Sequence, residues 1–238
     1  MKINLLRYLL TLICFIIIST FSSCQYGCYM VVYDDYEHME NDIGDECTFL
    51  ELKEGQKVAS IGASTGYFEI SCNLLNNTAI DFYIEDIDTI CDNQAEIDGI
   101  VNFYEEQFNT TFKGTFTSSI GTENSTKLPQ NTFDRVLCRI SFHHFPSPEN
   151  MLSEIHNILK ADGLLIIAEN LTPTTGILDP FCKSPLYAEK DLIELVEKNG
   201  FTLIDIIWTN KEYIESLKKP NPQKDTPYKM FKFKKKNT

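Results

Sequence analysis

The alternation of short apolar runs with amphipathic runs along residues 56–210 constrains the fold of this chain most strongly. Runs such as VASI and LLIIA are continuously apolar, which is typical of strands buried on both faces of a sheet. The run SPENMLSEIHNILK instead places its apolar residues at helical spacing. Strands that alternate with helices predict an α/β fold, namely a doubly wound, mostly parallel sheet.

Seven strands and four helices can be placed along this pattern. We expect strands at residues 56–62, 78–85, 114–120, 133–140, 164–170, 201–210 and 228–234, and helices at 66–75, 88–108, 147–160 and 188–200. A turn at Asp162–Gly163 should precede the fifth strand. The last two strands follow one another without a clear helix, so they should form an antiparallel pair at one edge.

The amino-terminal residues indicate export. Lys2 and Arg7 precede the apolar run YLLTLICFIIISTF, which is short for a membrane span and is followed by SSC. The stretch FSSC resembles the lipobox of bacterial lipoproteins, in which Cys24 would carry the lipid. We therefore expect a signal peptide at residues 1–23 and a protein anchored in the cell envelope, facing outside the cytoplasm. Plain secretion and an uncleaved anchor are the alternatives.

Charge restricts the partners. The chain has 34 acidic and 21 basic residues, and its formal net charge is −13. Contacts to nucleic acid need clustered Lys and Arg, so a nucleic-acid partner is not expected. Residues 24–46 are polar and acidic and should form a tether or a loose lid helix, with the folded domain at 47–238. The lysine-rich carboxyl terminus is interpreted as a final strand with solvated lysines, in preference to a contact with anionic lipid.

The cysteines of the mature chain contain no CxxC pair, so neither a zinc knuckle nor a redox pair is indicated, and no metal site is predicted. Cys72 and Cys138 lie in apolar patterns and should be core thiols. Cys28 and Cys47 flank the acidic segment and are candidates for a disulfide in an oxidising compartment.

The loop GASTG joins the first strand to a helix and is the first candidate for ligand binding. Gly62 and Gly66 allow a sharp turn and a close approach of a ligand to the backbone. Ser64 occupies the position of a middle glycine, so the dinucleotide pattern GxGxxG is missing and a dinucleotide-dependent oxidoreductase is disfavoured. Taken alone, the loop is equally consistent with a tight structural turn.

Polar residues follow the next two strands. Asp86 lies 20 residues after Gly66, at the position where a carboxylate can accept the hydroxyls of a ribose. Asp88 should cap the following helix. Thr122 and Glu123 follow the third strand, where they either face an adenine amine or form a hydrophilic turn.

Four segments in order, LELKEGQKVASIGASTGYF, YIEDID, KLPQNTFDRVLCRISFHHF and MLSEIHNILKADGLLIIAEN, resemble the class I S-adenosylmethionine-dependent methyltransferases. The resemblance covers residues 48–210 and is greatest to the branch that methylates small molecules, quinones and lipids. It implies a seven-stranded sheet whose last strand is antiparallel, with S-adenosylmethionine as cofactor. The implied cofactor residues are Gly62, Ala63, Ser64 and Gly66 at the methionine side, Asp86 at the ribose, Ile87, Thr122 and Glu123 at the adenine, and Arg139 after the fourth strand.

The chain departs from that family pattern at the methionine side. Ser60 stands where the first strand usually carries an acid that orients the amino group of the cofactor, and Ser64 replaces the middle glycine. The usual aspartate of the third loop is also missing, with Thr122 next to Gly121. We therefore expect methyl transfer to a small-molecule or lipid-like acceptor, with an exported non-catalytic binding or scaffold protein as the alternative.

His143 and His144 follow the fourth strand and are the catalytic candidates, since either imidazole can take a proton from an acceptor hydroxyl. Either can equally be a histidine that packs locally, and His144 is expected to face the cleft. Tyr67 is placed to touch either ligand. The long loop from Leu171 to Lys190 should help to cover the acceptor.

Overall fold

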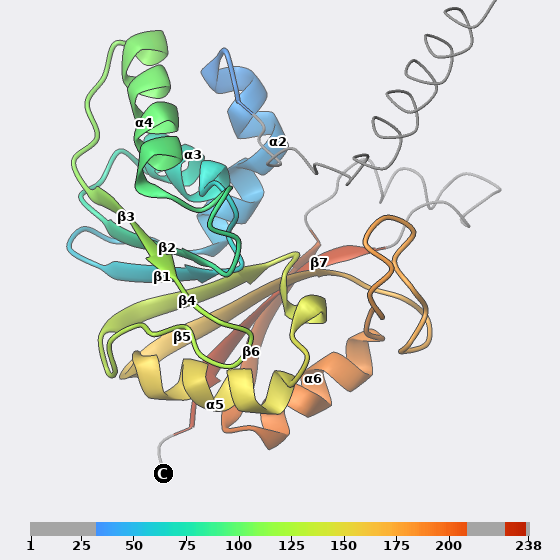
Figure 1. Ribbon diagram of the computed structural model, residues 1–238. Coiled ribbons are helices and arrows are strands. Elements are labelled where there is room, and N and C mark those ends of the chain that lie inside the picture. The colour runs from blue at the N-terminus through green and yellow to red at the C-terminus, as the bar shows by residue number, and fades with distance from the viewer. Residues whose placement is uncertain (1–31, 209–226, 237–238) are drawn as a thin grey trace, which may run out of the picture.

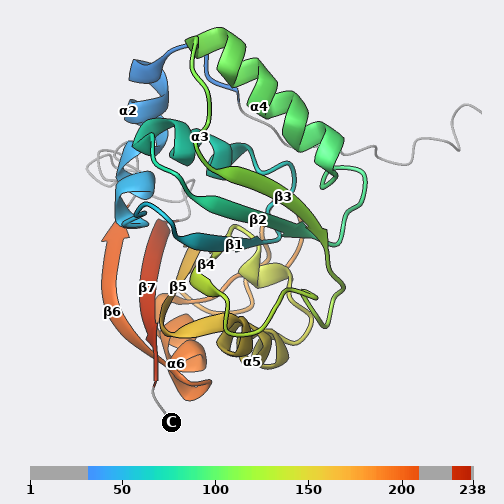
Figure 2. The same ribbon diagram turned by 90° about the vertical axis from the view of Figure 1, so that its left-hand side faces the viewer.

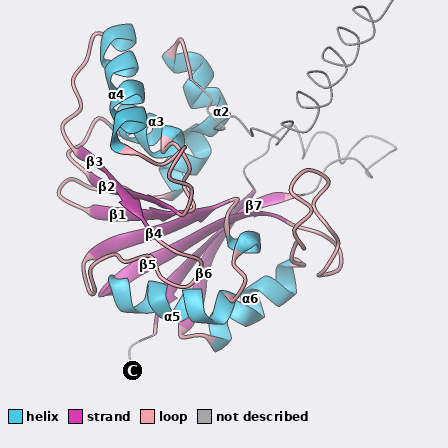
Figure 3. Cartoon of the chain, in the orientation of Figure 1, coloured by secondary structure: helices cyan, strands magenta, loops and turns pink. Residues whose placement is uncertain are grey.

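Seven strands form one sheet in the computed structural model, which describes residues 32–208 and 227–236 (Figures 1 and 3). The strand order is β3-β2-β1-β4-β5-β7-β6. The strands are β1 (Lys57–Ile61), β2 (Asp81–Asp86), β3 (Thr115–Ile120), β4 (Phe133–Arg139), β5 (Leu159–Asn170), β6 (Phe201–Trp208) and β7 (Tyr228–Lys235). The predicted fold class is confirmed.

The sheet is parallel except at β7. The strands β1 to β5 pair in parallel, whereas β7 lies between β5 and β6 and is antiparallel to both. The expected antiparallel pairing of the last two strands is therefore also confirmed. The chain fills one side of β1 with β2 and β3 and then returns to its other side with β4. Ligands of such sheets bind at this reversal, at the carboxyl ends of the strands.

Helices cover both faces of the sheet. The helices α2 (Tyr36–Phe49), α3 (Tyr67–Asn76) and α4 (Gln94–Phe108) lie on one face, and α5 (Pro148–Ile158) and α6 (Glu189–Lys198) on the other (Figures 1 and 2). Each layer buries its own apolar cluster, represented by Met39 and Ile70 on the first face and by Ile155 and Val196 on the second. No helix in the described ranges is long and apolar enough to cross a membrane. Cys24 and the predicted signal peptide lie outside these ranges.

The acidic segment, expected to be a tether or a loose lid helix, contains a helix, α2, that is packed into the core rather than loose. Asp35 caps it by accepting a hydrogen bond from the backbone N–H of His38, and Met39 and Ile43 are buried in the same core as α3. The expected domain boundary at Cys47 falls inside this helix. Most of its acidic residues lie on the solvent face, whereas Glu46 is buried, so the acidic composition did not indicate how tightly the helix packs.

A disulfide between Cys47 and Cys72 joins α2 to α3. The expected pairing of Cys28 with Cys47 is therefore wrong, and Cys72 is not a free core thiol. Cys91 is also disulfide-bonded. Cys138 is a free, buried thiol, as predicted.

The predicted helix at 88–108 begins later, at Gln94. Asn93, rather than Asp88, is its cap, because the Asn93 side chain accepts a hydrogen bond from the N–H of Glu96. Asp88 instead accepts from the N–H of Ile90, and such local side-chain bonds compete with helix formation. Ile90 therefore lies before the helix, and it is 76% exposed.

Two further expectations, one for β5 and one for β7, need correction. The predicted turn at Asp162–Gly163 lies within β5, and the pairing of β4 with β5 shifts register there. The lysines of β7 are not all solvated, since Lys229 and Lys232 are buried and pair with Glu189 and Glu51. These two ion pairs neutralise the lysines where the strand enters the core.

Candidate cofactor site

Two adjoining cavities open at the carboxyl ends of β1, β2 and β4. The larger has a volume of about 530 Å³ and is lined by Asp86, Ile87, Thr122 and Glu123, among others. The smaller, of about 370 Å³, is lined by the glycine loop, Tyr67, Glu69 and Arg139, among others. Gly62 and Ile140 line both, so the cavities share a wall. We call them the nucleoside cavity and the methionine cavity, after the cofactor parts that the family resemblance assigns to these residues.

The predicted site residues divide between these cavities as follows. Asp86, Ile87, Thr122, Glu123 and His144 lie in the nucleoside cavity with Gly62, and Gly62, Ala63, Ser64 and Arg139 lie in the methionine cavity. Ser60, Gly66 and His143 line neither. Ser60 is a buried residue of β1, Gly66 is the cap residue of α3, and His143 is buried.

The glycine loop has the left-handed backbone that such a turn requires. The φ angles of Gly62, Ser64 and Gly66 are 69°, 53° and 70°. Ser64 thus adopts the conformation of the glycine it replaces, at a cost of about 1–2 kcal/mol. At Gly62 a Cβ would lie 2.5 Å from the Cβ of Ser141, so only glycine fits between the loops after β1 and β4.

Asp86 ties this loop to β2. Its Oδ2 accepts a hydrogen bond from the backbone N–H of Ser64 at 2.9 Å, and its Oδ1 accepts from the N–H of Asp88 at 2.9 Å. Each carboxylate oxygen has a second lone pair, so Asp86 can still accept from the two hydroxyls of a ribose. The residue therefore both holds the loop and faces the nucleoside cavity.

Glu85 also lines the nucleoside cavity and was not predicted as a site residue. It is 2% exposed, and burial, with the neighbouring charge of Asp86, raises the pKa of its carboxyl to about 8. Gly121 makes room for it, since a Cβ there would lie 1.7 Å from Glu85 Oε1. At neutral pH Glu85 is a protonated acid that can donate a hydrogen bond. Its only signal in the sequence is that it is the first acid of the YIEDID run, directly before Asp86.

Glu69 supplies a carboxyl group to the methionine cavity, next to Ser60. The hydroxyl of Ser60 donates to Glu69 Oε1 at 2.6 Å. The Glu69 side chain is buried, its Oε2 has no hydrogen-bond partner among the described residues, and burial raises its pKa. The helix α3 therefore brings a carboxyl group to the first-strand position that lacks one. In the sequence, the only indication that Glu69 belongs to the site is that it is an acid within the mostly apolar start of this helix, GYFEISC.

Arg139 connects the methionine cavity to α2. Its Nε donates to Glu46 Oε2 at 2.9 Å, its Nη1 donates to the hydroxyl of Tyr67 at 3.1 Å, and its guanidinium lies 4.3 Å from the ring centre of Phe68. The hydroxyl of Tyr228 donates to the same oxygen of Glu46 at 3.0 Å. Arg139 is thus already paired on one side, and α2 closes that side of the cavity.

The two histidines lie on the short 3-10 helix η1 (Phe142–His144) and differ in environment. His144 is partly exposed and lines the nucleoside cavity. The buried part of its ring, together with the charge of His143, lowers its pKa. His143 is buried, and its Nδ1 lies 2.8 Å from Glu169 Oε2. Burial alone would lower the pKa of His143, but the hydrogen bond and charge of Glu169 raise it to about 9. Of the two histidines, His144 is therefore the one that lines a cavity.

Comparison with known proteins agrees with this geometry. The family model of the methyltransferase domain matches residues 36–206. An uncharacterized methyltransferase of Bacillus subtilis strain 168, YcgJ, is 25% identical over 144 residues, which are 59% of this chain and 51% of YcgJ. This chain thus matches about half the length of that relative.

Solved structures share the fold. A SAM-dependent methyltransferase from Aquifex aeolicus superposes with a TM-score of 0.56 at 17% identity, covering 84% of this chain and 93% of the other. The 1,6-didemethyltoxoflavin-N1-methyltransferase of Burkholderia thailandensis was solved with 1,6-didemethyltoxoflavin and S-adenosylhomocysteine. It superposes with a TM-score of 0.59 at 19% identity, covering 83% of this chain and 80% of the other. With the family match over most of its length, the chain belongs to the methyltransferase-domain family.

Proposed function

We propose that this protein transfers a methyl group from S-adenosylmethionine to a small-molecule or lipid-like acceptor. The observation that carries the proposal is the buried carboxyl of Glu69, whose Oε2 has no partner among the described residues and which lines the cavity beside the glycine loop. An unpaired buried carboxylate oxygen is costly, and the ammonium group of the methionine moiety would satisfy it. The missing acid at Ser60 is thereby replaced from α3.

The residues at the other end fit the rest of the cofactor. Asp86 has free lone pairs for two ribose hydroxyls, Ile87 offers an apolar contact, and Thr122 and Glu123 border the same space. When bound, the cofactor supplies an electrophilic methyl group on a sulfonium. The contribution of the protein is to hold an acceptor atom in line with that methyl group and to exclude water.

His144 is the proposed base. Its ring lines the nucleoside cavity, and its lowered pKa keeps the imidazole neutral at neutral pH, in the form that accepts a proton. The loop between β5 and α6 reaches this histidine through Ser184, whose Oγ lies 3.0 Å from His144 Nδ1. We propose that this loop forms part of the acceptor site.

We further propose that the protein works outside the cytoplasm, anchored through Cys24 or secreted. The disulfide-bonded state of Cys47, Cys72 and Cys91 favours an oxidising compartment. Cys24→Ala should release the protein from membranes, as measured by fractionation. Membrane retention equal to that of the parent would contradict the lipid anchor.

Calorimetric titration with S-adenosylmethionine tests the cofactor, using protein purified without reductant. One site with a micromolar dissociation constant is expected, and S-adenosylhomocysteine should compete for it. Absence of heat at cofactor concentrations up to about 1 mM, equivalent to a binding free energy weaker than about −4 kcal/mol, would contradict the enzyme and favour the exported scaffold.

The acceptor class is tested with tritiated methyl groups. The labelled cofactor is incubated with the protein and an organic extract of cell envelopes. We expect label in the lipid or small-molecule fraction, reduced at least tenfold by His144→Ala. Label that enters only added protein or nucleic acid would contradict this acceptor class.

A further inference from the structure

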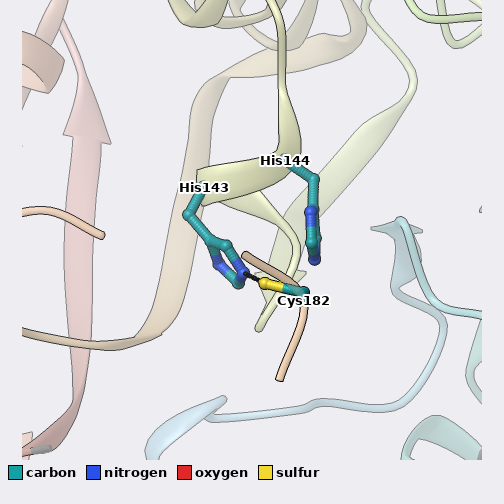
Figure 4. A group of neighbouring side chains, drawn as sticks. All are labelled: His143, His144 and Cys182. Carbon is teal, nitrogen blue, oxygen red and sulfur yellow. Dashed lines mark hydrogen bonds between the residues drawn. The ribbon is translucent and has the colours of Figure 1, made fainter. Parts of the chain in front are cut away.

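Three side chains of metal-binding type converge beside the nucleoside cavity (Figure 4). His143 and His144 come from η1, and Cys182 comes from the loop between β5 and α6. One ligand atom from each lies within 4.8 Å of the other two. Cys182 is far from the histidines in sequence, so no local motif in the chain indicates this group.

The separation of the imidazole and the thiol suits a shared ion. His143 Nε2 lies 3.4 Å from Cys182 Sγ. In a tetrahedral zinc site, bonds of about 2.3 Å to sulfur and about 2.05 Å to nitrogen place neighbouring N and S ligands about 3.6 Å apart. The observed separation of the nitrogen and the sulfur is within a few tenths of an ångström of this value. Binding an ion would therefore require only a small adjustment of the two side chains.

A buried carboxylate orients the first ligand. Glu169, which is 1% exposed, accepts from the backbone N–H of His143 at 3.2 Å, and its Oε2 lies 2.8 Å from His143 Nδ1. This contact places the Nδ1 proton toward Glu169 and turns Nε2 toward Cys182. A carboxylate behind a histidine is the usual support of a zinc-binding imidazole.

The other two ligands are also held in place. Ser184 Oγ lies 3.0 Å from His144 Nδ1, which leaves Nε2 of that ring for a metal. Asp179 Oδ1 accepts from the N–H groups of Phe181 and Cys182 at 2.7 and 3.0 Å, and the N–H of Ser184 donates to Cys182 Sγ at 3.4 Å. The loop that brings the thiol to the histidines is therefore fixed by its own hydrogen bonds.

We propose that His143, His144 and Cys182 bind one divalent transition-metal ion of the zinc class. Two imidazoles and a thiolate suit a borderline-soft ion rather than Mg²⁺ or Ca²⁺. Binding forms one metal–sulfur and two metal–nitrogen bonds and releases two protons to solvent, one from the thiol and one from Nε2 of the His143 imidazolium. The ion loses three waters, and no electron is transferred. No metal site was predicted from the sequence, because metal-binding motifs are recognised by ligands that lie close together along the chain.

Three protein ligands leave the fourth position open, as in catalytic rather than structural zinc sites. His144 lines the nucleoside cavity, so the open position lies next to the space assigned to the reaction. In the metal-bound protein His144 is a ligand, and the ion, rather than this imidazole, would activate a hydroxyl or thiol held there. Metal binding itself does not depend on the proposed methyl transfer.

Cobalt substitution tests the site. Protein treated with a chelator and dialysed without oxygen is titrated with Co²⁺ and then with Zn²⁺. We expect one equivalent of Co²⁺ to produce a thiolate-to-cobalt charge-transfer band in the near ultraviolet, which Zn²⁺ removes. Cys182→Ser should abolish the band and weaken Zn²⁺ at least tenfold, and Glu169→Gln should weaken Zn²⁺ by about 10–100-fold.

Matched controls are Cys138→Ala, which removes the other described free thiol, and His156→Gln, which removes a histidine remote from the cluster. Both should keep the band. Circular dichroism confirms that the Cys182→Ser variant is folded, as expected for an exposed side chain.

Two results would overturn the proposal: a parent protein without a stoichiometric thiolate band, or a band that survives in Cys182→Ser. Alkylation of Cys182 gives an independent measurement, because bound Zn²⁺ should slow it at least tenfold. An unchanged alkylation rate would show that the thiol only hydrogen-bonds to His143. Titration with S-adenosylmethionine is a separate measurement, so failure of the metal site and failure of the proposed function are distinguishable.

Discussion

The two cavities of the site differ in how closely they follow the family pattern. The nucleoside cavity is lined by Asp86, Ile87, Thr122 and Glu123, which the sequence resemblance assigned to it. The methionine cavity departs at Ser60 and Ser64, and the carboxyl group found there belongs to Glu69 of α3. Strand ends fix where a binding site lies, whereas a required charge can come from any element that reaches it.

The largest expected effect is on how stability depends on pH, through Glu85 of the nucleoside cavity. The pKa of the Glu85 carboxyl is raised from 4.5 to about 8 in the folded state. Its contribution to the stability of the fold is therefore complete below pH 4.5 and is lost as the pH rises to about 8. Glu85→Gln removes this titration. Relative to the parent, its free energy of unfolding should rise by about 4 kcal/mol between pH 5 and pH 9. Urea unfolding at both pH values measures this, and a difference independent of pH would contradict a buried neutral Glu85.

Asp86→Ala should weaken the binding of both S-adenosylmethionine and methylthioadenosine, which lacks the amino-acid part. We expect about a 100-fold loss, or about 3 kcal/mol, because the carboxylate holds Ser64 and, in the proposed complex, also accepts from the ribose. Asp88→Ala removes an equal charge from the same loop and should change affinity by less than about threefold. Equal losses in the two variants would show that general charge matters rather than the ribose contact.

Glu69→Gln should distinguish the two ligands. The loss of the carboxylate should weaken S-adenosylmethionine by about 10–100-fold, the value of a hydrogen bond to a charged group. The affinity for methylthioadenosine should stay within about twofold of that of the parent protein, because this ligand has no ammonium group that could bond to Glu69. Calorimetry with both ligands makes the comparison, and parallel losses would indicate a structural rather than a ligand-binding role for Glu69.

Ser64→Gly is expected to have the smallest effect. It removes a Cβ from a left-handed position at a φ of 53° and widens the methionine cavity. S-adenosylmethionine should bind a few-fold more tightly. Stability should rise by only about 1 kcal/mol, because relief of the left-handed strain, about 1–2 kcal/mol, is partly offset by the backbone entropy of glycine, about 0.5–1 kcal/mol. Weaker binding would instead show that the serine hydroxyl contacts the cofactor.

Much of the fold was predictable because it depends on local patterns. Continuous apolar runs located the strands, and the order of motifs located the nucleoside cavity. Features that depend on long-range contact were not predictable, including the disulfide between Cys47 and Cys72 and the packing of α2. The same holds for Glu69 beside Ser60 and for Cys182 beside His143, since each pair is brought together by separate elements of the chain.

The most direct test of the central claim is a crystal structure of the protein with S-adenosylhomocysteine. The account predicts that the amino nitrogen of this ligand lies about 2.7–3.2 Å from Glu69 Oε2, the range of a direct hydrogen bond, while its ribose hydroxyls contact Asp86. An amino group bound elsewhere, with Glu69 Oε2 still unpaired, would contradict the replacement of the first-strand acid by α3.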